Sequence, residues 1–419
     1  MKKDLLHTPE GVRDIYGAEC RFKSRVTELL KGVCERYGYS QIQTPSFEFF
    51  DVFNSERGSV PSNEMFKFFD HHGNTLVLRP DMTPAVARSA AKYFGESGLP
   101  VKVYYEANTF VNHENAYRGQ LKENTTVGAE LIGDNEPDED FEIICMAIEC
   151  MKAAGLKNFQ VEIGNIRFFR GLLKEAGISG DDEEELVSLI NKKNFLGVEE
   201  LLKELAPDSP AVRPLTALPQ LFGTREVLDK AAAMTDNEDC AFAINRLCDL
   251  YEKFRDYGYE EYISFDLGSL SSHAYYTGII FHAYTFGTGE AVLSGGRYDK
   301  LIAQFGVDRP SIGFSVVVDR LVEALSRQNI SLSDDIESVL FVYDDEALGK
   351  AENLAFQLRG RGQRIGLIKK KEGMKNTDYA DYAHEWRFKK VIMLSGDKTS
   401  LLINEDGTAE PVVTKKLLE

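Results

Sequence analysis

Apolar residues recur every three or four positions over residues 19–37, which is the spacing of the buried face of an amphipathic helix. A short strand-like run follows over residues 39–44. Residues 65–70 and 75–79 are two further strand-like runs, and the Gly-Asn turn between them predicts a β-hairpin. The N-terminal part of the chain is therefore expected to fold as a helix, a strand and a hairpin. The apolar face of the helix consists of Phe22, Val26, Leu29, Leu30, Val33 and Cys34.

Two longer strands dominate the next part of the pattern. The first begins with the apolar run at residues 103–105 and continues through Phe110 and Val111. The second covers residues 127–132 and reads Val-Gly-Ala-Glu-Leu-Ile. A polar loop, residues 112–123, separates them. The pattern predicts two strands joined by a long loop, with a single acidic residue inside the second strand.

The middle and the end of the chain differ in pattern. Residues 327–337 are polar and read as a linker. Beyond them, strand-like and helix-like segments alternate, which predicts a small α/β domain with a parallel sheet over residues 338–419. We therefore expect an α+β protein with its core at residues 1–326. A mainly helical insertion interrupts this core at about residues 165–260.

The composition is ordinary for a globular protein, because 43% of the 419 residues are hydrophobic and 28% are charged. Six scattered cysteines without a Cys-x-x-Cys pair favour reduced thiols over a disulfide or zinc framework. No apolar run approaches the roughly 20 residues that span a bilayer, and the N-terminus lacks a signal-peptide core. We expect a cytoplasmic protein without a membrane partner, a metal or a cofactor.

The net charge of −18 disfavours a nucleic-acid partner, since that binding depends largely on clustered lysine and arginine. The densest acidic run, residues 134–142, comes before a helix expected from Phe141 to Ala154. Acidic side chains suit the positive end of a helix, so we interpret this run as a solvated helix start. A metal site in the run is the less favoured alternative.

Several segments follow one another as they do in the histidyl-tRNA synthetases of class II. The chain resembles that family in its dimerisation motif 1, in motif 2, in motif 3, in two histidine-specific segments and in a Gly-Gly-Arg-Tyr-Asp turn. The resemblance implies a class II synthetase-like core of antiparallel strands with flanking helices. It also implies that the C-terminal α/β domain is similar to an anticodon-binding domain. The Gly-Gly of residues 293–299 is expected to let a ligand approach the backbone. The matching segments are residues 19–48, 79–85, 103–133, 269–278, 293–299 and 311–321.

The resemblance implies a pocket for the amino group of histidine at residues 79–85. Asp81 and Thr83 match the carboxylate and the hydroxyl that bind this group in the family. A carboxylate facing an ammonium forms a charge-assisted hydrogen bond. The alternative is that Asp81 only caps the helix expected from Thr83 to Tyr93, a role that its residue type favours.

The imidazole side of the pocket is implied by two other segments. Glu130 matches the carboxylate that reads the imidazole, and Thr126 stands where the family usually has Gln. Tyr275 and Tyr276 match a tyrosine pair that closes over the ring. The alternative for Glu130 is a buried residue whose hydrogen bonds are all made within the protein. The alternative for Tyr275 and Tyr276 is aromatic packing in the core.

The nucleotide side looks degenerate by the same resemblance. Asn112 stands in place of the motif 2 Arg, and Ser271 stands in place of the histidine-specific Arg. An amide or a hydroxyl cannot supply the fixed positive charge that adenylyl transfer requires. Arg320 of motif 3 is retained. We therefore expect no catalytic residues and a residual nucleotide site.

A chain that keeps the amino-acid pocket but lacks two arginines of the nucleotide site resembles the ATP phosphoribosyltransferase regulatory subunits. These subunits are paralogues of histidyl-tRNA synthetases. This resemblance implies a short-form catalytic partner, histidine as ligand and feedback signal, and a homodimer within a hetero-oligomer. No tRNA partner is expected. A divergent histidine–tRNA ligase is the alternative, and a scaffold paralogue is a third hypothesis. The sequence leaves open whether histidine binds in this pocket or at a subunit boundary.

Overall fold

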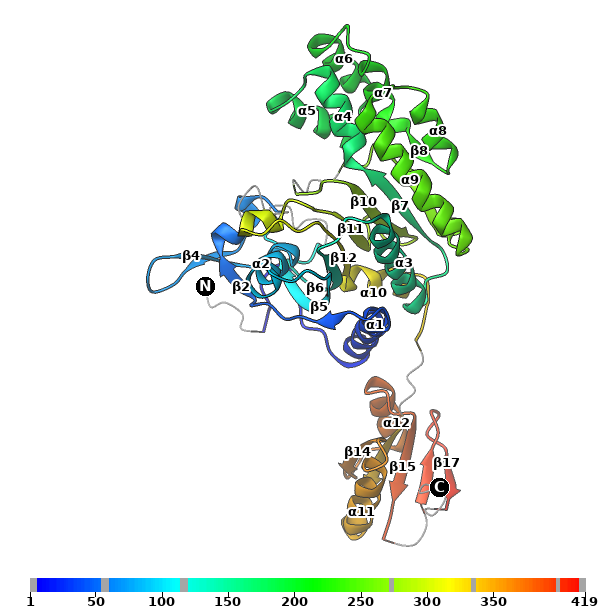
Figure 1. The fold of residues 1–419 in the computed structure, drawn as a ribbon. Helices are drawn as coiled ribbons and strands as arrows, with labels where there is room; N and C mark the ends of the chain where they lie inside the picture. Colours follow the sequence, from blue (N-terminus) through cyan, green and yellow to red (C-terminus); the bar gives the residue numbers. More distant parts are fainter. Residues whose placement is uncertain are drawn as a thin grey trace. The chain divides into compact units, whose positions relative to one another are not determined.

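The computed structural model describes six stretches of the chain and divides it into two compact units. The first unit comprises residues 1–13 and 25–331, and the second comprises residues 14–24 and 332–419. Figure 1 colours the chain from blue at the N-terminus to red at the C-terminus. The described stretches are residues 6–53, 60–113, 120–270, 275–332, 337–396 and 400–413.

The first unit is built on a nine-stranded sheet with the order β1-β5-β6-β12-β11-β10-β7-β9-β8. Neighbouring strands from β5 to β7 are all antiparallel, whereas β1–β5 and β7–β9 are parallel. This core, with helices beside it, confirms the predicted α+β fold of class II synthetase type. The strands are β1 (Ser40–Gln41), β5 (Val101–Phe110), β6 (Glu123–Ile132), β7 (Phe159–Asn165), β8 (Phe222–Gly223), β9 (Ile263–Asp266), β10 (Ile279–Thr285), β11 (Leu293–Arg297) and β12 (Ser311–Val317).

Helices pack on both faces of this sheet. Helix α2 lies on the face that carries Val103 and Tyr105, with which it forms one apolar cluster. Helix α1 meets the opposite face, where the Tyr104 hydroxyl donates to Glu35 at 2.7 Å. Successive strand residues point to opposite faces, so neighbouring tyrosines of β5 serve different layers. The helices are α1 (Gly17–Arg36), α2 (Thr83–Phe94), α3 (Pro137–Ala153) and α10 (Val318–Arg327).

Six helices, drawn in green in Figure 1, lie between β7 and β9 in the chain. The first begins where the Asn165 side chain accepts the backbone N–H of Arg167, and it ends at Gly177 with φ 72°. Arg167 in turn pairs with Asp239 of the last helix at 2.7 Å. The ion pair joins the start of the first helix to the start of the last one. The helices are α4 (Ile166–Ala176), α5 (Asp181–Asn191), α6 (Phe195–Leu205), α7 (Val212–Ala217), α8 (Glu226–Ala232) and α9 (Glu238–Asp256).

The predicted hairpin is confirmed as part of a three-stranded sheet with the order β2-β4-β3. Its turn is held by Asp70, whose carboxylate accepts the backbone N–H groups of His72 and Asn74. The strand expected at residues 39–44 is shorter, since only the two residues of β1 pair with β5. The strands of the small sheet are β2 (Phe47–Phe49), β3 (Lys67–Phe69) and β4 (Thr75–Leu78).

The second unit contains a five-stranded sheet with the order β14-β13-β15-β16-β17. The alternating strands and helices match the sequence prediction, and β13 is parallel to both β14 and β15. The expectation of a wholly parallel sheet is wrong, because β16 and β17 add an antiparallel hairpin. A hairpin needs no crossover helix, so the strand–helix alternation carried no sign of it. The elements are β13 (Ser338–Tyr343), α11 (Leu348–Arg359), β14 (Arg364–Lys369), α12 (Asn376–Glu385), β15 (Lys390–Leu394), β16 (Ser400–Ile403) and β17 (Ala409–Val412).

The acidic run at residues 134–142 requires a second correction. Helix α3 begins within it, at Pro137, and Asp140 is fully buried. The carboxylate of Asp140 pairs with Arg246 at 2.6 Å and with Arg297 at 2.7 Å. The interpretation as a solvated helix start is therefore wrong at this residue. A buried charge is stable only when it is paired, and both partners lie more than 100 residues away in the chain.

All six cysteines are free. Four of them, Cys34, Cys145, Cys150 and Cys240, are buried, and burial raises the pKa of the Cys145 thiol to about 12. Within the described stretches, every helix is too short or too polar to cross a membrane.

Candidate functional site

Glu130 is the centre of a buried polar cluster on one face of the large sheet. It belongs to β6, stands opposite Gly313 of β12 and is 1% exposed. One carboxylate oxygen accepts the Thr83 hydroxyl at 2.9 Å, and the other accepts the Tyr298 hydroxyl at 2.6 Å. Thr83 begins α2, and Tyr298 directly follows β11. Three segments that are distant in the chain thus meet at one carboxylate.

Burial raises the pKa of Glu130 to about 8. The hydrogen bonds from Tyr298 and Thr83 favour the ionised form and oppose this shift, whereas the charge of Asp81 adds to it. No lysine or arginine of the described stretches forms an ion pair with Glu130. A carboxyl group held in this state readily releases its proton to a basic partner, or ionises beside a cation. The cluster is therefore suited to a group that can share a proton with it.

Asp81 supplies a second carboxylate next to this cluster. One of its oxygens accepts the backbone N–H groups of Met82 and Thr83 at 2.6 and 3.3 Å, at the beginning of α2. The other oxygen accepts the Tyr275 hydroxyl at 3.1 Å. Asp81 therefore stabilises the helix start and also faces the tyrosine pair. The capping role and a ligand-facing role are compatible in this arrangement.

The two tyrosines expected at the pocket form an aromatic corner. The rings of Tyr275 and Tyr276 lie edge to face with centroids 4.9 Å apart, and Tyr275 is 6.0 Å from Tyr298 in a similar arrangement. All three rings are buried in the cluster that includes α2. Asp81 and Glu130 thus lie among aromatic rings, which suit a flat, polar ligand group.

Glycines in β11 and β12 make room for these side chains. A Cβ atom on Gly313 would lie 1.6 Å from a carboxylate oxygen of Glu130, and one on Gly296 would lie 2.7 Å from the ring of Tyr276. Gly295 and Gly296 were expected to let a ligand approach the backbone. In the structure, Gly296 and Gly313 accommodate the protein's own pocket side chains. Because residues alternate along a strand, Gly296 and Tyr298 face the pocket while Arg297 points to α3 and pairs with Asp140.

Thr126 lies on the same face of β6 as Glu130, four residues before it. It is buried, and its hydroxyl donates to the carbonyl oxygen of Ala107 on β5 at 3.1 Å. The hydroxyl is thus engaged by the sheet itself.

Two of the positions predicted to form a degenerate nucleotide site are engaged by the chain's own side chains. The Asn112 side chain accepts from the Lys122 ammonium at 2.9 Å. Arg320 forms an ion pair with Glu290, whose other carboxylate oxygen accepts the side-chain amide of Gln120 at 2.6 Å. Ser271 lies outside the described residues. Asn112 carries no charge, and the charge of Arg320 is paired with Glu290 in this arrangement.

Two tyrosines of the cluster were not expected from the sequence. Tyr298 stands two residues after Gly296, so strand alternation within that segment is the signal that places it in the pocket. Tyr105 lies on β5 and packs in the same apolar cluster. Its place beside Glu130 depends on how β5 pairs with β6, and the sequence pattern contains no sign of that register.

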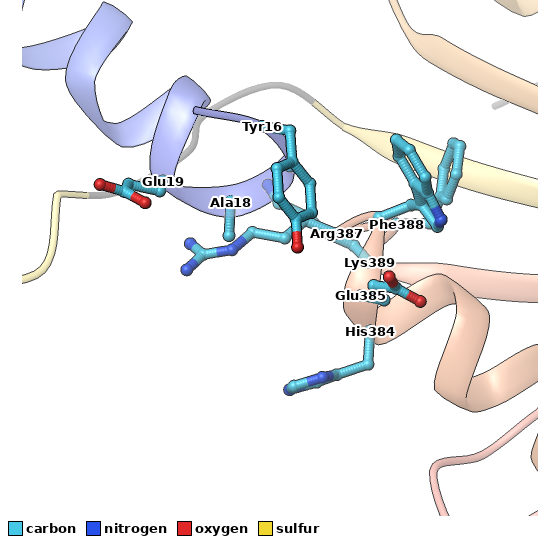
Figure 2. A pocket seen from close by; sticks show the side chains of 10 residues that line it. Tyr16, Ala18, Glu19, His384, Glu385, Arg387, Phe388 and Lys389 are labelled. Atoms are coloured by element: carbon cyan, nitrogen blue, oxygen red, sulfur yellow. The ribbon is translucent and has the colours of Figure 1, made fainter. Parts of the chain in front are cut away.

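The second unit has a hollow of its own, shown in Figure 2. It has a volume of about 690 Å³ and is lined by residues 16–19 and 384–389. Figure 2 shows Tyr16, His384 and Arg387 among the side chains at its wall. None of the lining residues belongs to the Glu130 cluster, and of them only Glu19 falls in a segment that matches a synthetase motif.

The comparisons with known proteins agree with this geometry. The sequence model of the Histidyl-tRNA synthetase family matches residues 11–321. The chain is 40% identical over 360 residues to the ATP phosphoribosyltransferase regulatory subunit of Acetivibrio thermocellus, covering 86% of each chain. It is 38% identical over 334 residues to that of Clostridium acetobutylicum, covering 78% of this chain and 82% of the relative. The chain belongs to the family of ATP phosphoribosyltransferase regulatory subunits.

Solved structures give the same answer for the fold. A protein from Bacillus halodurans C, described as an ATP phosphoribosyltransferase regulatory subunit/histidyl-tRNA synthetase, superimposes with a TM-score of 0.81 at 29% identity. The match covers 94% of this chain and all of that one. Histidyl-tRNA synthetase from Nostoc sp. PCC 7120 superimposes with a TM-score of 0.80 at 20% identity, covering 99% of each chain. This second likeness shows the fold alone, and the predicted family resemblance is confirmed.

Proposed function

We propose that this chain is the histidine-sensing regulatory subunit of an ATP phosphoribosyltransferase. In this proposal it assembles, as a homodimer within a hetero-oligomer, with a short-form catalytic subunit in the cytoplasm. The complex joins ATP to phosphoribosyl pyrophosphate in the first step of histidine biosynthesis. The chain itself carries out no reaction, and histidine bound to it lowers the activity of the catalytic partner.

The observation that carries the histidine assignment is the state of Glu130. Its buried carboxylate is bonded to two neutral hydroxyls and to no cation of the described residues. Asp81 adds a second carboxylate at the edge of the same cluster. A ligand with an ammonium group and a proton-sharing ring complements both carboxylates, and histidine has these two groups. An apolar amino acid would leave Glu130 buried without a new partner.

The nucleotide side argues against the alternative, a divergent histidine–tRNA ligase. Asn112 is an amide bonded to Lys122, and Arg320 is paired with Glu290. Removing a single transition-state electrostatic donor commonly lowers a rate by about 10²- to 10³-fold. A ligase would show histidine-dependent exchange of pyrophosphate into ATP, and we expect none from this chain.

Feedback requires that histidine favours one arrangement of the complex over another, since a ligand with equal affinity for both shifts nothing. A coupling free energy of about 1–3 kcal/mol corresponds to roughly 5- to 150-fold inhibition. Glu130 is suited to this coupling because its hydrogen bonds join β6 to α2 and to the segment after β11. A ligand that changes these bonds acts on three segments together.

The test combines the purified chain with a short-form ATP phosphoribosyltransferase and follows turnover while histidine is titrated. Turnover should depend on the chain, and histidine should suppress it. The Glu130→Ala complex should keep its turnover and lose most of the inhibition, because the proton-sharing group is gone. Glu106→Ala is the matched control, since Glu106 lies on β5, is exposed and pairs with Lys31. Equal inhibition of parent and Glu130→Ala complexes would refute the assignment.

A further inference from the structure

The hollow of the second unit brings three kinds of side chain together (Figure 2). Its lining residues all belong to that unit and come from two segments, one at the start of α1 and one at the end of α12. Its volume of about 690 Å³ lies within the range of roughly 300–1,000 Å³ that is typical of small-ligand sites. Aromatic rings, cations and carboxylates all occur in the lining. The hollow therefore has the size and the chemical variety of a ligand site.

Arg387 is held in an unusual backbone conformation at the wall of this hollow. Its φ is 50°, in the left-handed region that glycine adopts most easily. The N–H of Arg387 donates to the carbonyl of His384 at 3.1 Å, and the N–H of Phe388 donates to that of Ala383 at 2.8 Å. Helices that end with these two bonds commonly have Gly at the position of Arg387. Backbone strain of this kind gathers at ligand sites, so the arginine points to a role for its side chain.

A second arginine, Arg364 of β14, supports the segment that carries Arg387. Its guanidinium lies over the Phe388 ring, 4.5 Å from the centroid. It also donates to the carbonyl oxygens of Trp386 and Arg387, at 3.0 and 3.3 Å. Among the described residues, the side chains of Arg387 and Lys389 form no ion pair. One arginine thus positions the segment, and two cations of that segment keep their charge for a ligand.

The rings and the cations of the lining match two parts of a nucleotide. Trp386 and Tyr16 are 39% and 74% exposed, and an exposed aromatic ring lets a base stack on it. Arg387 and Lys389 supply positive charge for phosphate oxygens, and a guanidinium can bind a phosphate through two hydrogen bonds. A ligand with only a ring or only a phosphate would use half of these groups.

Two carboxylates, Glu19 and Glu385, complete the lining. An ionised carboxylate only accepts hydrogen bonds, so these groups suit a ligand that carries hydroxyls beside its phosphate. We propose that this hollow binds a nucleotide, with the base against the aromatic rings, the phosphate at the two cations and the ribose hydroxyls at the carboxylates. The nucleotide site shares no residue with the Glu130 cluster, so its test is independent of the histidine site.

Trp386 is the only tryptophan of the chain, so tryptophan fluorescence reports directly on this hollow. The experiment titrates the full chain with ADP, follows the emission, and repeats the titration by calorimetry. ADP should quench the emission to saturation, because its base stacks on the indole. Adenosine and pyrophosphate should each bind about tenfold more weakly, since each offers only part of the ligand. No binding of ADP by either method, or equal binding of pyrophosphate and ADP, would overturn the proposal.

Arg387→Gly separates the role of the side chain from that of the fold. Glycine adopts the left-handed conformation without strain, so the variant should unfold at the same temperature as the parent or a higher one. ADP should bind to it about tenfold more weakly, because one of the two cations is gone. Equal affinity of parent and variant for ADP would refute the assignment of the phosphate to Arg387.

Lys193→Gly is the matched control from the first unit. Lys193 has φ 53° and also stands two residues after the end of a helix, α5. Its N–H donates to Ile190 at 2.9 Å, and the N–H of Asn194 donates to Leu189 at 2.9 Å, which is the same pair of bonds as at Arg387. This change should leave the affinity for ADP as it is in the parent. A similar loss of affinity in both variants would also refute the proposal, because the effect would then come from the glycine and not from the site.

Discussion

The affinity for histidine should follow pH in a way that reports on the Glu130 proton. In the empty protein the pKa of Glu130 is about 8, whereas a free imidazole side chain titrates near ~6.5. Between these two values the empty site carries a proton and the ligand ring does not. Histidine can then bind with one proton shared between its ring and the Glu130 carboxylate. No proton is taken up from solution or released to it. The affinity should therefore be constant over this range.

Outside this range the proton count changes on binding. Above pH 8 the empty Glu130 is ionised and the complex must take up a proton, so the affinity should fall about tenfold per pH unit, or about 1.4 kcal/mol. At pH 9.5 the loss should be roughly 30-fold relative to the plateau. Below about pH 6.5 both ring and carboxyl are protonated, one proton must leave, and the affinity should fall with the same slope.

The assay is calorimetric titration of histidine from pH 5.5 to 9.5 on the parent chain and on Glu130→Gln. Glutamine keeps the size of the side chain but cannot titrate. The α-ammonium group of histidine titrates in both experiments, so the ratio of the two affinities isolates the contribution of Glu130. The parent should lose affinity relative to the variant as the pH rises above 8. Identical alkaline slopes in the two proteins would refute the shared-proton account.

Two further predictions concern the packing around the site. Asp140→Asn should lower the free energy of unfolding by about 3–5 kcal/mol, measured with denaturant, because it leaves the buried Arg297 and the partly buried Arg246 against a neutral side chain. A loss below 1 kcal/mol would contradict the buried pairing. Gly313→Ala should abolish histidine binding, since its Cβ would lie 1.6 Å from a Glu130 oxygen. Gly289→Ala is its control, because a Cβ there meets no atom within 4 Å, and equal binding by the two variants would contradict the steric account.

Elements set by neighbouring residues were predicted well. The helix expected at residues 19–37 is α1, and the hairpin at residues 65–79 is β3 and β4. The alternation beyond residue 338 appears as β13, α11, β14, α12 and β15. These patterns depend on side chains a few positions apart, so the chain reveals them without its tertiary contacts. The antiparallel pair β16–β17 was missed because its short strands show no such regularity.

The residues around Glu130 illustrate what local pattern cannot reveal. Thr83 and Tyr298, which donate to Glu130, lie 47 and 168 residues away in the chain. Tyr105 reaches the same cluster only through the register of β5 against β6. Asp140 looked like part of a solvated acidic run, yet its partner Arg297 comes from a distant strand. In each case the environment is made by pairing between strands or by packing of a helix on the sheet.

The sequence by itself determined the fold class, the order of the synthetase-like motifs and the replacement of an expected arginine by Asn112. Each of these follows from residue types and from spacing along the chain. Only the tertiary structure decided that Glu130 is bonded to two hydroxyls and to no cation of the described stretches, and that Arg320 is paired with Glu290. The physical reason is that burial and hydrogen-bond partners are set by contacts between distant segments. The burial that those contacts produce raises the pKa of Glu130 to about 8, against the opposing effect of its two hydrogen bonds.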